Sequence, residues 1–243
     1  MNAAALPPPR PRQEPFWNWT DALLLAALAI PCFSLALVLT HGFFLLLPSM
    51  PGEAARALAM QFAAYAFWFG ALWLILRQRY HAPFWTSLGW RFPWPNMLAT
   101  AVLGPALVIF VAILGELLHT PVIDNAVARL LRDRWSVLLV GSFAVTLGPL
   151  AEELIFRGFL QPLAVRTFGA WLGITVASAP FALLHGPQYS WNWQHMLLLF
   201  LASFVFGYTR HRTGSTAAST IVHATYNLTF FAGYVAQRRE LLM

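Results

Sequence analysis

Residues 97–118 read MLATAVLGPALVIFVAILGELL, and this stretch decides the class of fold. Its one ionisable residue is Glu116, close to the end of the run. A helix needs about 20 mostly apolar residues to cross the hydrocarbon core of a bilayer, and this stretch meets that length. The whole sequence agrees, because 59% of its 243 residues are hydrophobic and 10% are charged. Ordinary soluble domains carry roughly 25% charged residues, so the composition indicates a membrane protein.

Similar apolar runs lie on both sides of this stretch. The candidate spans are residues 21–47, 55–77, 97–118, 135–150, 170–184, 195–209 and 216–236. The run 135–150 is short, and we expect it to continue through 151–165 as one longer or broken helix, with kinks at Pro149 and Pro162. Charged and apolar residues mixed over 120–134 predict an amphipathic interfacial helix. The sequence therefore predicts an all-α fold, a polytopic transmembrane helix bundle of about seven spans (six to eight).

The charged residues lie mostly in the tail and the loops. The run PPPRPR at 7–12 predicts a disordered Pro/Arg-rich tail over 1–18, before a single membrane domain over 19–243. The arginines that give the net charge of +6 stand between apolar runs, where loops meet anionic lipid head groups. Their spread does not favour nucleic acid as a partner, and it favours an N-terminus on the inside. Cys32 is the single cysteine, which excludes an internal disulfide and a cysteine-based metal cluster.

Ionisable residues inside membrane helices are costly, so those in the second half of the chain need an explanation. Glu152 and Glu153 are adjacent, and successive helical residues point about 100° apart. Glu153 and Arg157 stand at i and i+4 with the acid first, which is the favourable order for an ion pair. Glu152 then faces elsewhere without a cationic partner, as a general base that activates water requires. A structural Glu–Arg network at a helix end is the alternative, and we favour it for Glu153 and Arg157.

Three further polar residues follow along the chain. His185 ends an apolar run before a Gly-Pro pair, where a histidine by itself is more often structural. His223 and Asn227 stand at i and i+4, and a pair of donors on one helix face suits a developing oxyanion. Hydrogen bonding of His and Asn between membrane helices is an equally open interpretation. Together the residues offer a base (Glu152), a water-orienting imidazole (His185) and an oxyanion clamp (His223 and Asn227).

Three strings carry a resemblance to a known family. They are GPLAEELIFRG at 148–158, APFALLHG at 179–186, and RTGS at 212–215 followed by HATYN at 223–227. In this order and spacing they resemble the CPBP family of CAAX-protease and bacteriocin-processing membrane enzymes, also called the Abi family. They are similar to the type II CAAX prenyl endopeptidases within that family. The resemblance covers roughly residues 140–230, which we take as the catalytic core.

The resemblance implies an intramembrane endopeptidase. We expect no cofactor, because the sequence has no His-Glu-x-x-His signature and the i, i+4 pair of His223 and Asn227 suits a metal-free clamp. The resemblance implies cleavage near the C-terminus of a membrane-associated substrate, of which a prenylated CAAX protein is one type. It also implies a multi-pass protein of a prokaryotic inner (cell) membrane. By position it implies a water-activating pair, an oxyanion pair and a supporting pair, which are Glu152 with His185, His223 with Asn227, and Glu153 with Arg157.

Two alternatives stay open. In a metalloprotease mechanism, Glu152, His185 and His223 would form a zinc site with Glu153 as the base. A non-catalytic transporter or a peptide-binding immunity protein would also place ionisable residues inside the membrane. Transporters more often show inverted repeats, whereas the polar motifs here are confined to the second half of the chain, which favours the enzyme.

Overall fold

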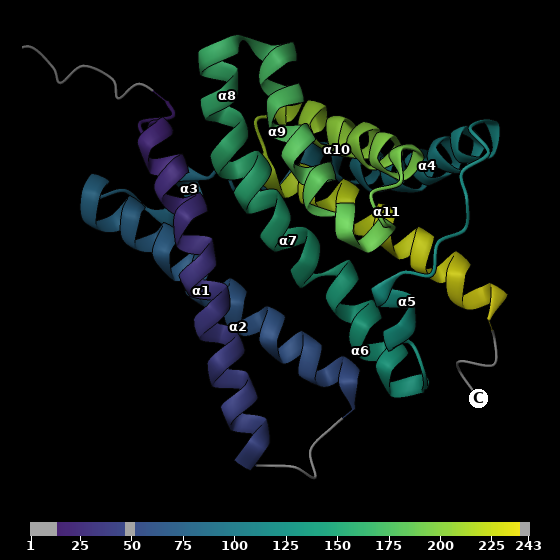
Figure 1. Cartoon of the computed structure of the whole chain (residues 1–243). Coiled ribbons are helices and arrows are strands. Elements are labelled where there is room, and N and C mark those ends of the chain that lie inside the picture. Colours follow the sequence, from purple (N-terminus) through teal and green to yellow (C-terminus); the bar gives the residue numbers. More distant parts are fainter. Residues whose placement is uncertain (1–13, 47–51, 239–243) are drawn as a thin grey trace, which may run out of the picture.

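The computed structural model describes residues 14–46 and 52–238, and every regular element in these ranges is helical. Most of the predicted tail, residues 1–13, lies outside the described residues. Two long helices, α1 (Trp19–Leu46) and α2 (Glu53–Leu74), pack against each other on one flank of the molecule (Figure 1). The segment Ile75–Arg79 continues α2 as a π-helix.

A long run of helix crosses the middle of the molecule and separates this flank from the rest (Figure 1). It consists of α6 (Arg134–Val145), α7 (Leu147–Glu153), a π-helix (Leu154–Leu160) and α8 (Gln161–Phe168). The other side is formed by α4 (Met97–Leu117), α9 (Ala170–Leu184), α10 (Trp193–Thr213) and α11 (Thr216–Gln237). Short helices α3 (Phe84–Ser87) and α5 (Ala126–Leu130) lie in the connections.

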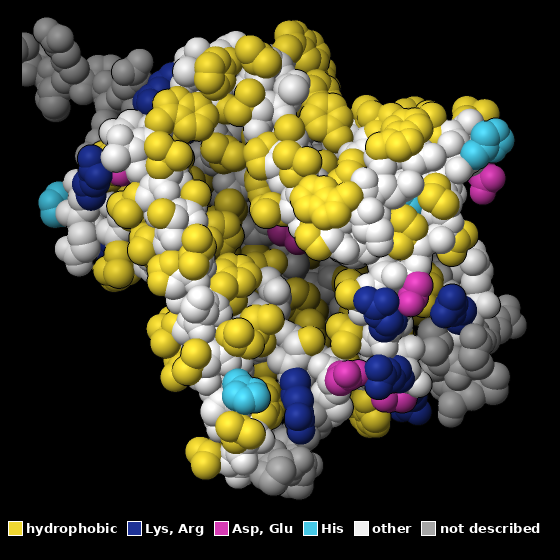
Figure 2. Space-filling model, in the orientation of Figure 1, with side chains coloured by type: hydrophobic (Ala, Val, Ile, Leu, Met, Phe, Trp, Pro, Cys, Tyr) yellow, Lys and Arg dark blue, Asp and Glu magenta, His cyan; other side chains and the backbone are white. Residues whose placement is uncertain are grey.

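Four helical segments within the described ranges are long and apolar enough to cross a membrane. They are Trp19–Leu46, Glu53–Arg79, Trp94–Leu117 and Arg134–Phe168, whereas the apolar helix α9 is shorter. Figure 2 shows hydrophobic side chains over much of one face. On α1, for example, Leu23, Ile30 and Val38 are exposed. A surface of this kind suits contact with lipid rather than water. The predicted all-α polytopic bundle is confirmed, and the number of about seven spans stays a prediction.

The central run agrees with the prediction that 135–150 and 151–165 form one broken helix. Asp133 starts it, because its carboxylate accepts a hydrogen bond from the N–H of Ser136 at 2.9 Å and the Ser136 hydroxyl accepts one from the N–H of Asp133 at 3.0 Å. The helix breaks at Thr146, where φ is −119° and ψ is −79°. Pro149 follows within one turn and has no N–H to donate to the preceding turn. The π-helix ends two residues before Pro162.

The interfacial helix predicted over 120–134 is wrong in length. Before α6 begins at Arg134, only α5 (Ala126–Leu130) is helical in this range, and Val122 is fully exposed ahead of it. The Asn125 side chain caps α5 by accepting a hydrogen bond from the N–H of Ala128 at 2.8 Å. Asp133 is the N-cap of α6. Because Asn125 and Asp133 both start helices, the segment between them has room for little more than one helical turn.

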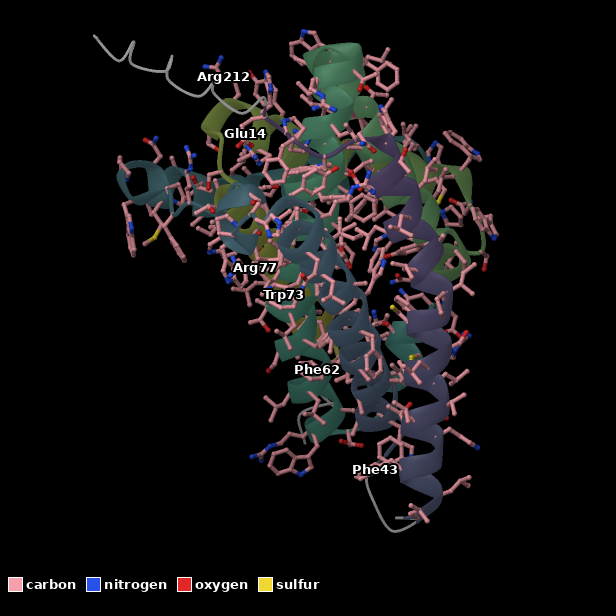
Figure 3. All side chains as sticks on the ribbon, turned by 90° about the vertical axis from the view of Figure 1, so that its left-hand side faces the viewer. Glu14, Phe43, Phe62, Trp73, Arg77 and Arg212 are labelled. Carbon is pink, nitrogen blue, oxygen red and sulfur yellow. The ribbon has the colours of Figure 1, made fainter. Side chains whose placement is uncertain are left out.

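The segment before α1 packs against the π-helix of the central run. Trp17 is almost fully buried, its ring stacks on Phe159 with centroids 5.2 Å apart, and its Nε1 donates to the Phe159 carbonyl at 3.0 Å. In Figure 3 the labelled Glu14 lies at this end of the bundle and Phe43, near the other end of α1, lies at the opposite end. The beginning of α1 is thereby fixed to the helix that carries the polar residues of the site.

Gly104 lets α4 and α11 approach closely, and we expect Gly104→Ala to destabilise the bundle. A Cβ at residue 104 would lie 2.5 Å from the backbone nitrogen of Tyr226 and 2.6 Å from the carbonyl oxygen of Val222. Because these are backbone atoms, the two helices would have to separate, at a cost of about 1–3 kcal/mol. A lower apparent melting temperature in detergent would show this effect.

Gly115→Ala is the matched control in the same helix. A Cβ at residue 115 would meet Leu198 Cδ1 at 3.5 Å, an ordinary contact with the end of a flexible side chain. We therefore expect this variant to melt close to the unmodified protein. Equal destabilisation by both substitutions would contradict the close approach at Gly104.

Candidate active site

A buried ion pair lies where the central run meets α10 and α11. Arg157 Nη1 is 2.8 Å from Glu153 Oε1, and both side chains are fully buried. The ion pair predicted from the i, i+4 spacing is therefore confirmed. A charge in a low-dielectric interior is tolerated only when it is paired and hydrogen-bonded, so these two side chains depend on each other.

Other contacts of Arg157 tie the π-helix to α10. Its Nη2 donates to both the carbonyl oxygen and the hydroxyl of Ser203, each at 2.6 Å. The guanidinium also stands over the ring of Phe181, 4.9 Å from its centroid, which links it to α9. π-Helical segments are rare and occur frequently at functional sites. Here the π-helix holds the cation that compensates the buried glutamate.

His223 of α11 is held between the two glutamates. Its Nδ1 is 2.9 Å from Glu153 Oε1, and its Nε2 is 3.8 Å from Glu152 Oε2. The imidazole ring stacks on Phe206 of α10, with centroids 4.5 Å apart and an interplanar angle of 19°. A carboxylate can only accept, so Nδ1 carries the proton of its bond to Glu153. The ring is thereby fixed with Nε2 directed at Glu152.

Ser219 is a site residue that the sequence analysis missed. It is fully buried one turn before His223, and its hydroxyl donates to Glu153 Oε2. The Phe206 carbonyl oxygen is 3.0 Å from the same hydroxyl, but a carboxylate is the stronger acceptor for its single proton. The spacing of four residues before His223 was the available signal, because it places Ser219 on the same face of α11.

Glu152 has a different environment from its neighbour. Its side chain is 25% exposed, whereas that of Glu153 is fully buried. Within the described part of the chain, His223 Nε2 is its one ion-pair contact, at a distance longer than a direct hydrogen bond. The predicted division, one glutamate in an ion pair and one facing elsewhere, agrees with this geometry.

His185 lies close to the same cluster at the end of α9. Its Nδ1 donates to the carbonyl oxygen of Phe181 at 2.8 Å, which leaves Nε2 as the ring nitrogen that can accept. The Phe181 ring contacts both imidazoles, with centroids 4.8 Å from His185 and 5.7 Å from His223. No hydrogen bond or ion pair between described residues joins His185 to Glu152 directly.

Asn227 has a structural partner. Its Nδ2 donates to the carbonyl oxygen of Ala144 at 2.8 Å. Ala144 lies in the last turn of α6, whose carbonyls lose their usual partners where the helix breaks at Thr146. Asn227 therefore holds α11 to this break. One of its two amide hydrogens remains for another acceptor, and it shares a helix face with His223.

The part of the chain that carries the site matches one family of known proteins. The model of the family described as type II CAAX prenyl endopeptidase Rce1-like matches residues 134–229. The matched segment, less than half of the chain, is similar to that family, and we call it the Rce1-like segment. Comparison with curated proteins and with solved structures gave no match. The resemblance to CAAX proteases, inferred from three strings over roughly 140–230, is therefore confirmed.

The Rce1-like segment runs from the start of α6 into α11. It contains all the predicted site residues, which are Glu152, Glu153, Arg157, His185, His223 and Asn227. It also contains Ser203 and Ser219, which complete the buried cluster. The match supports a CAAX-type protease embedded in the membrane, acting on a membrane-associated substrate. Helices α1, α2 and α4 lie outside the matched segment.

The zinc alternative does not fit this arrangement of the Rce1-like segment. Over residues 14–46 and 52–238, no group of three or more His, Cys, Asp or Glu side chains is placed so that it could hold a metal ion. The set Glu152, His185 and His223 is included in that search. His223 moreover directs one ring nitrogen at Glu153 rather than at a shared centre.

We expect Ser219→Ala to weaken the buried cluster. The substitution removes the hydroxyl that donates to Glu153 Oε2, and a hydrogen bond to a charged group contributes about 1.5–3 kcal/mol. A decrease in the apparent melting temperature, together with a lower rate of peptide hydrolysis, would show this loss. The matched control is Thr220→Val, because among the described residues the Thr220 hydroxyl bonds a carbonyl of its own helix, that of Thr216, and no other group. The expectation would be wrong if both variants melted at the temperature of the unmodified protein.

Proposed function

We propose that the chain is an intramembrane endopeptidase that hydrolyses a peptide bond near the C-terminus of a membrane-associated substrate of the CAAX type. The observation that carries this proposal is the position of His223. Its Nδ1 is fixed by the compensated Glu153, and its Nε2 faces the partly exposed Glu152 at 3.8 Å. The match of residues 134–229 to Rce1-like proteins supports the same class of reaction.

Glu152 takes the role of the general base. Glu153 is paired with Arg157 and accepts from Ser219 and His223, so its oxygens are committed to the buried cluster. Glu152 keeps lone pairs for a proton, and a gap of 3.8 Å to His223 Nε2 allows a water molecule to hydrogen-bond to both groups. Proton transfer to a positioned carboxylate accelerates such reactions by about 10²–10⁴-fold.

Hydrolysis in this proposal takes two steps and forms no covalent bond to the enzyme. The water oxygen attacks the carbonyl carbon of the scissile peptide bond while its proton passes to Glu152. The resulting oxyanion is stabilised by donors on one face of α11, His223 Nε2–H in its protonated form and the second amide hydrogen of Asn227. The carbon–nitrogen bond then breaks, and Glu152 gives its proton to the leaving amine.

In this proposal His185 orients the attacking water. Because its Nδ1–H is donated to the Phe181 carbonyl, the neutral ring presents the lone pair of Nε2. A lone pair can accept the second hydrogen of the attacking water, which fixes the direction of the water oxygen. The Phe181 ring packs against both His185 and His223, so it contributes to the distance between the two imidazoles.

The direct test is hydrolysis by the purified full-length protein. It would be incubated with a panel of peptides that end in a CAAX sequence, prenylated and unprenylated, and with the same peptides carrying a C-terminal amide. Mass spectrometry would locate the cut, in the presence and absence of a chelator. We expect a new C-terminus near the end of the prenylated peptides in both conditions.

Two results would oppose the proposal in different ways. Saturable binding of the peptides without cleavage of any would indicate a peptide-binding membrane protein instead of a protease. Loss of cleavage in chelator, with recovery on addition of zinc, would keep the protease and replace the glutamate mechanism by a metal-dependent one.

A further inference from the structure

A second polar site lies at the end of the bundle that holds the N-terminal segment. It is a pocket of about 340 Å³ between the segment before α1, α3, the beginning of α8 and the end of α10. Its volume is within the range of small-ligand sites. None of the residues in the proposed active site lines it. The charged or hydrogen-bonding side chains on its wall include Glu14, Ser87, Gln161, Arg166, Arg210 and His211.

Arg210 is fixed in the wall of this pocket. Arginines at the ends of membrane helices usually extend their charged group into water. Here Nε donates to the Thr216 hydroxyl at 3.0 Å, and the guanidinium packs over Gly89, where a Cβ would collide with it. Gly89 also has a φ of +68°, which favours glycine. The sequence thus keeps space for a guanidinium that is held inside the protein.

The cations of the pocket are not neutralised by acidic side chains. Across the described ranges, the ion pairs include neither Arg210 nor Arg166. Arg166 donates to the main-chain oxygens of Pro15 and Trp17, which carry no net charge.

Burial and the neighbouring Arg91 lower the pKa of Arg210 to about 10, so it stays charged at neutral pH. Glu14, an exposed residue, is the one acid on the wall. Two arginines against one exposed carboxylate attract an anion.

The position of the pocket indicates which anion reaches it. The membrane-spanning run Arg134–Phe168 ends here and the span Trp19–Leu46 begins here. Figure 3 shows Glu14 and Arg212 at this same end of the bundle. The pocket is therefore at the depth of lipid head groups, and an excess of arginine marks the side with anionic lipid.

Gln161 is part of the pocket wall. Its side chain is buried, its Nε2 donates to the Gly207 carbonyl at 2.8 Å, and its Oε1 has almost no accessible surface. A ligand in the pocket therefore meets the two arginines rather than this oxygen.

We propose that this pocket binds the phosphate of an anionic membrane lipid through Arg166 and Arg210. This binding does not depend on the proposed protease activity. The lipid would also hold the N-terminal segment against α8, because Arg166 bonds that segment and lines the pocket at once.

Native mass spectrometry of the full-length protein in a neutral detergent tests the proposal. The protein would be titrated with phosphatidylglycerol, with phosphatidylcholine and with inorganic phosphate. We expect saturable retention of one phosphatidylglycerol, with at least about tenfold weaker retention of the other two. Arg166→Gln and Arg210→Gln should each weaken it by about tenfold, because each removes a charge-assisted hydrogen bond.

Arg212→Gln, at this end of the bundle, and Arg77→Gln, farther along it, are the controls, because both arginines are exposed and neither lines the pocket (Figure 3). They should bind phosphatidylglycerol like the unmodified protein. If they weaken binding as much as the pocket variants, the attraction is only a general surface effect and the proposal is wrong.

Three other results would also overturn the proposal. They are unchanged binding in Arg166→Gln, equal retention of phosphatidylcholine, and tight binding of inorganic phosphate alone. Should Arg210→Gln fail to fold, the exposed Arg166 decides the question by itself.

Discussion

Glu152→Gln is expected to reduce kcat for peptide hydrolysis by about 10²–10⁴-fold while leaving KM and the apparent melting temperature nearly unchanged. The amide has the shape of the carboxyl group but cannot take a proton from water. Glu152 is partly exposed and makes no ion pair shorter than 3.8 Å within the described residues, so folding depends little on its charge. A kinetic assay on a peptide that the unmodified protein cleaves, combined with thermal unfolding in detergent, measures both quantities.

Glu116→Gln is the control for this substitution. Glu116 is also an acid at the end of an apolar helix, but it is exposed and lies outside the Rce1-like segment. We expect its variant to retain the full rate. Full activity of Glu152→Gln would contradict the role of Glu152 as the base. A large fall in melting temperature would show instead that the carboxylate is part of the folded framework.

The sequence was sufficient for those parts of the site that belong to one helix. The interval between Glu153 and Arg157 determines that the two side chains share a face, and the ion pair survives although a π-helix begins between them. Likewise, adjacency alone separates Glu152 from Glu153. Such relations need only the period of the helix, so they can be derived before any tertiary contact is known.

The contacts between helices could not be predicted in this way. Ser203 bonds Arg157 from a position 46 residues along the chain, and Phe206 stacks on His223 from α10. Each looks like any other small or aromatic residue of an apolar helix. Their place depends on how α10 crosses the central run and α11, and this crossing is set by packing rather than by a sequence period.

Asn227 shows why a pattern can leave two interpretations open. The interval to His223 correctly places both side chains on one face of α11, which suits an oxyanion clamp and interhelical bonding equally well. The structure adds a partner for one amide hydrogen, the Ala144 carbonyl beside the break at Thr146. The Ala144 carbonyl is free to accept this bond because the central run is broken at Thr146. The sequence indicates a kink at Pro149, but it does not indicate which carbonyl loses its partner within the helix.

Arg157→Met is expected to produce the largest loss of stability, about 3–5 kcal/mol, or on the order of 10 °C in apparent melting temperature. Methionine fills much of the same space, but it leaves the fully buried Glu153 without its cation and Ser203 without its donor. The free-energy cost of a buried carboxylate without a cation is larger than the stabilisation from the apolar contacts of the methionine. Unfolding followed by tryptophan fluorescence in detergent would measure the shift.

The double variant Glu153→Gln, Arg157→Met separates the cost of the stranded charge from the cost of lost packing. If the charge dominates, neutralising Glu153 restores a large part of the stability that the single variant loses. The exposed pair of Arg129 and Asp124, 3.2 Å apart, provides the comparison, because Arg129→Met there should cost less than about 1 kcal/mol. A double variant as unstable as Arg157→Met alone would mean that the guanidinium matters through its contacts with Ser203 and Phe181, and that the buried pair does not supply the stability assigned to it here.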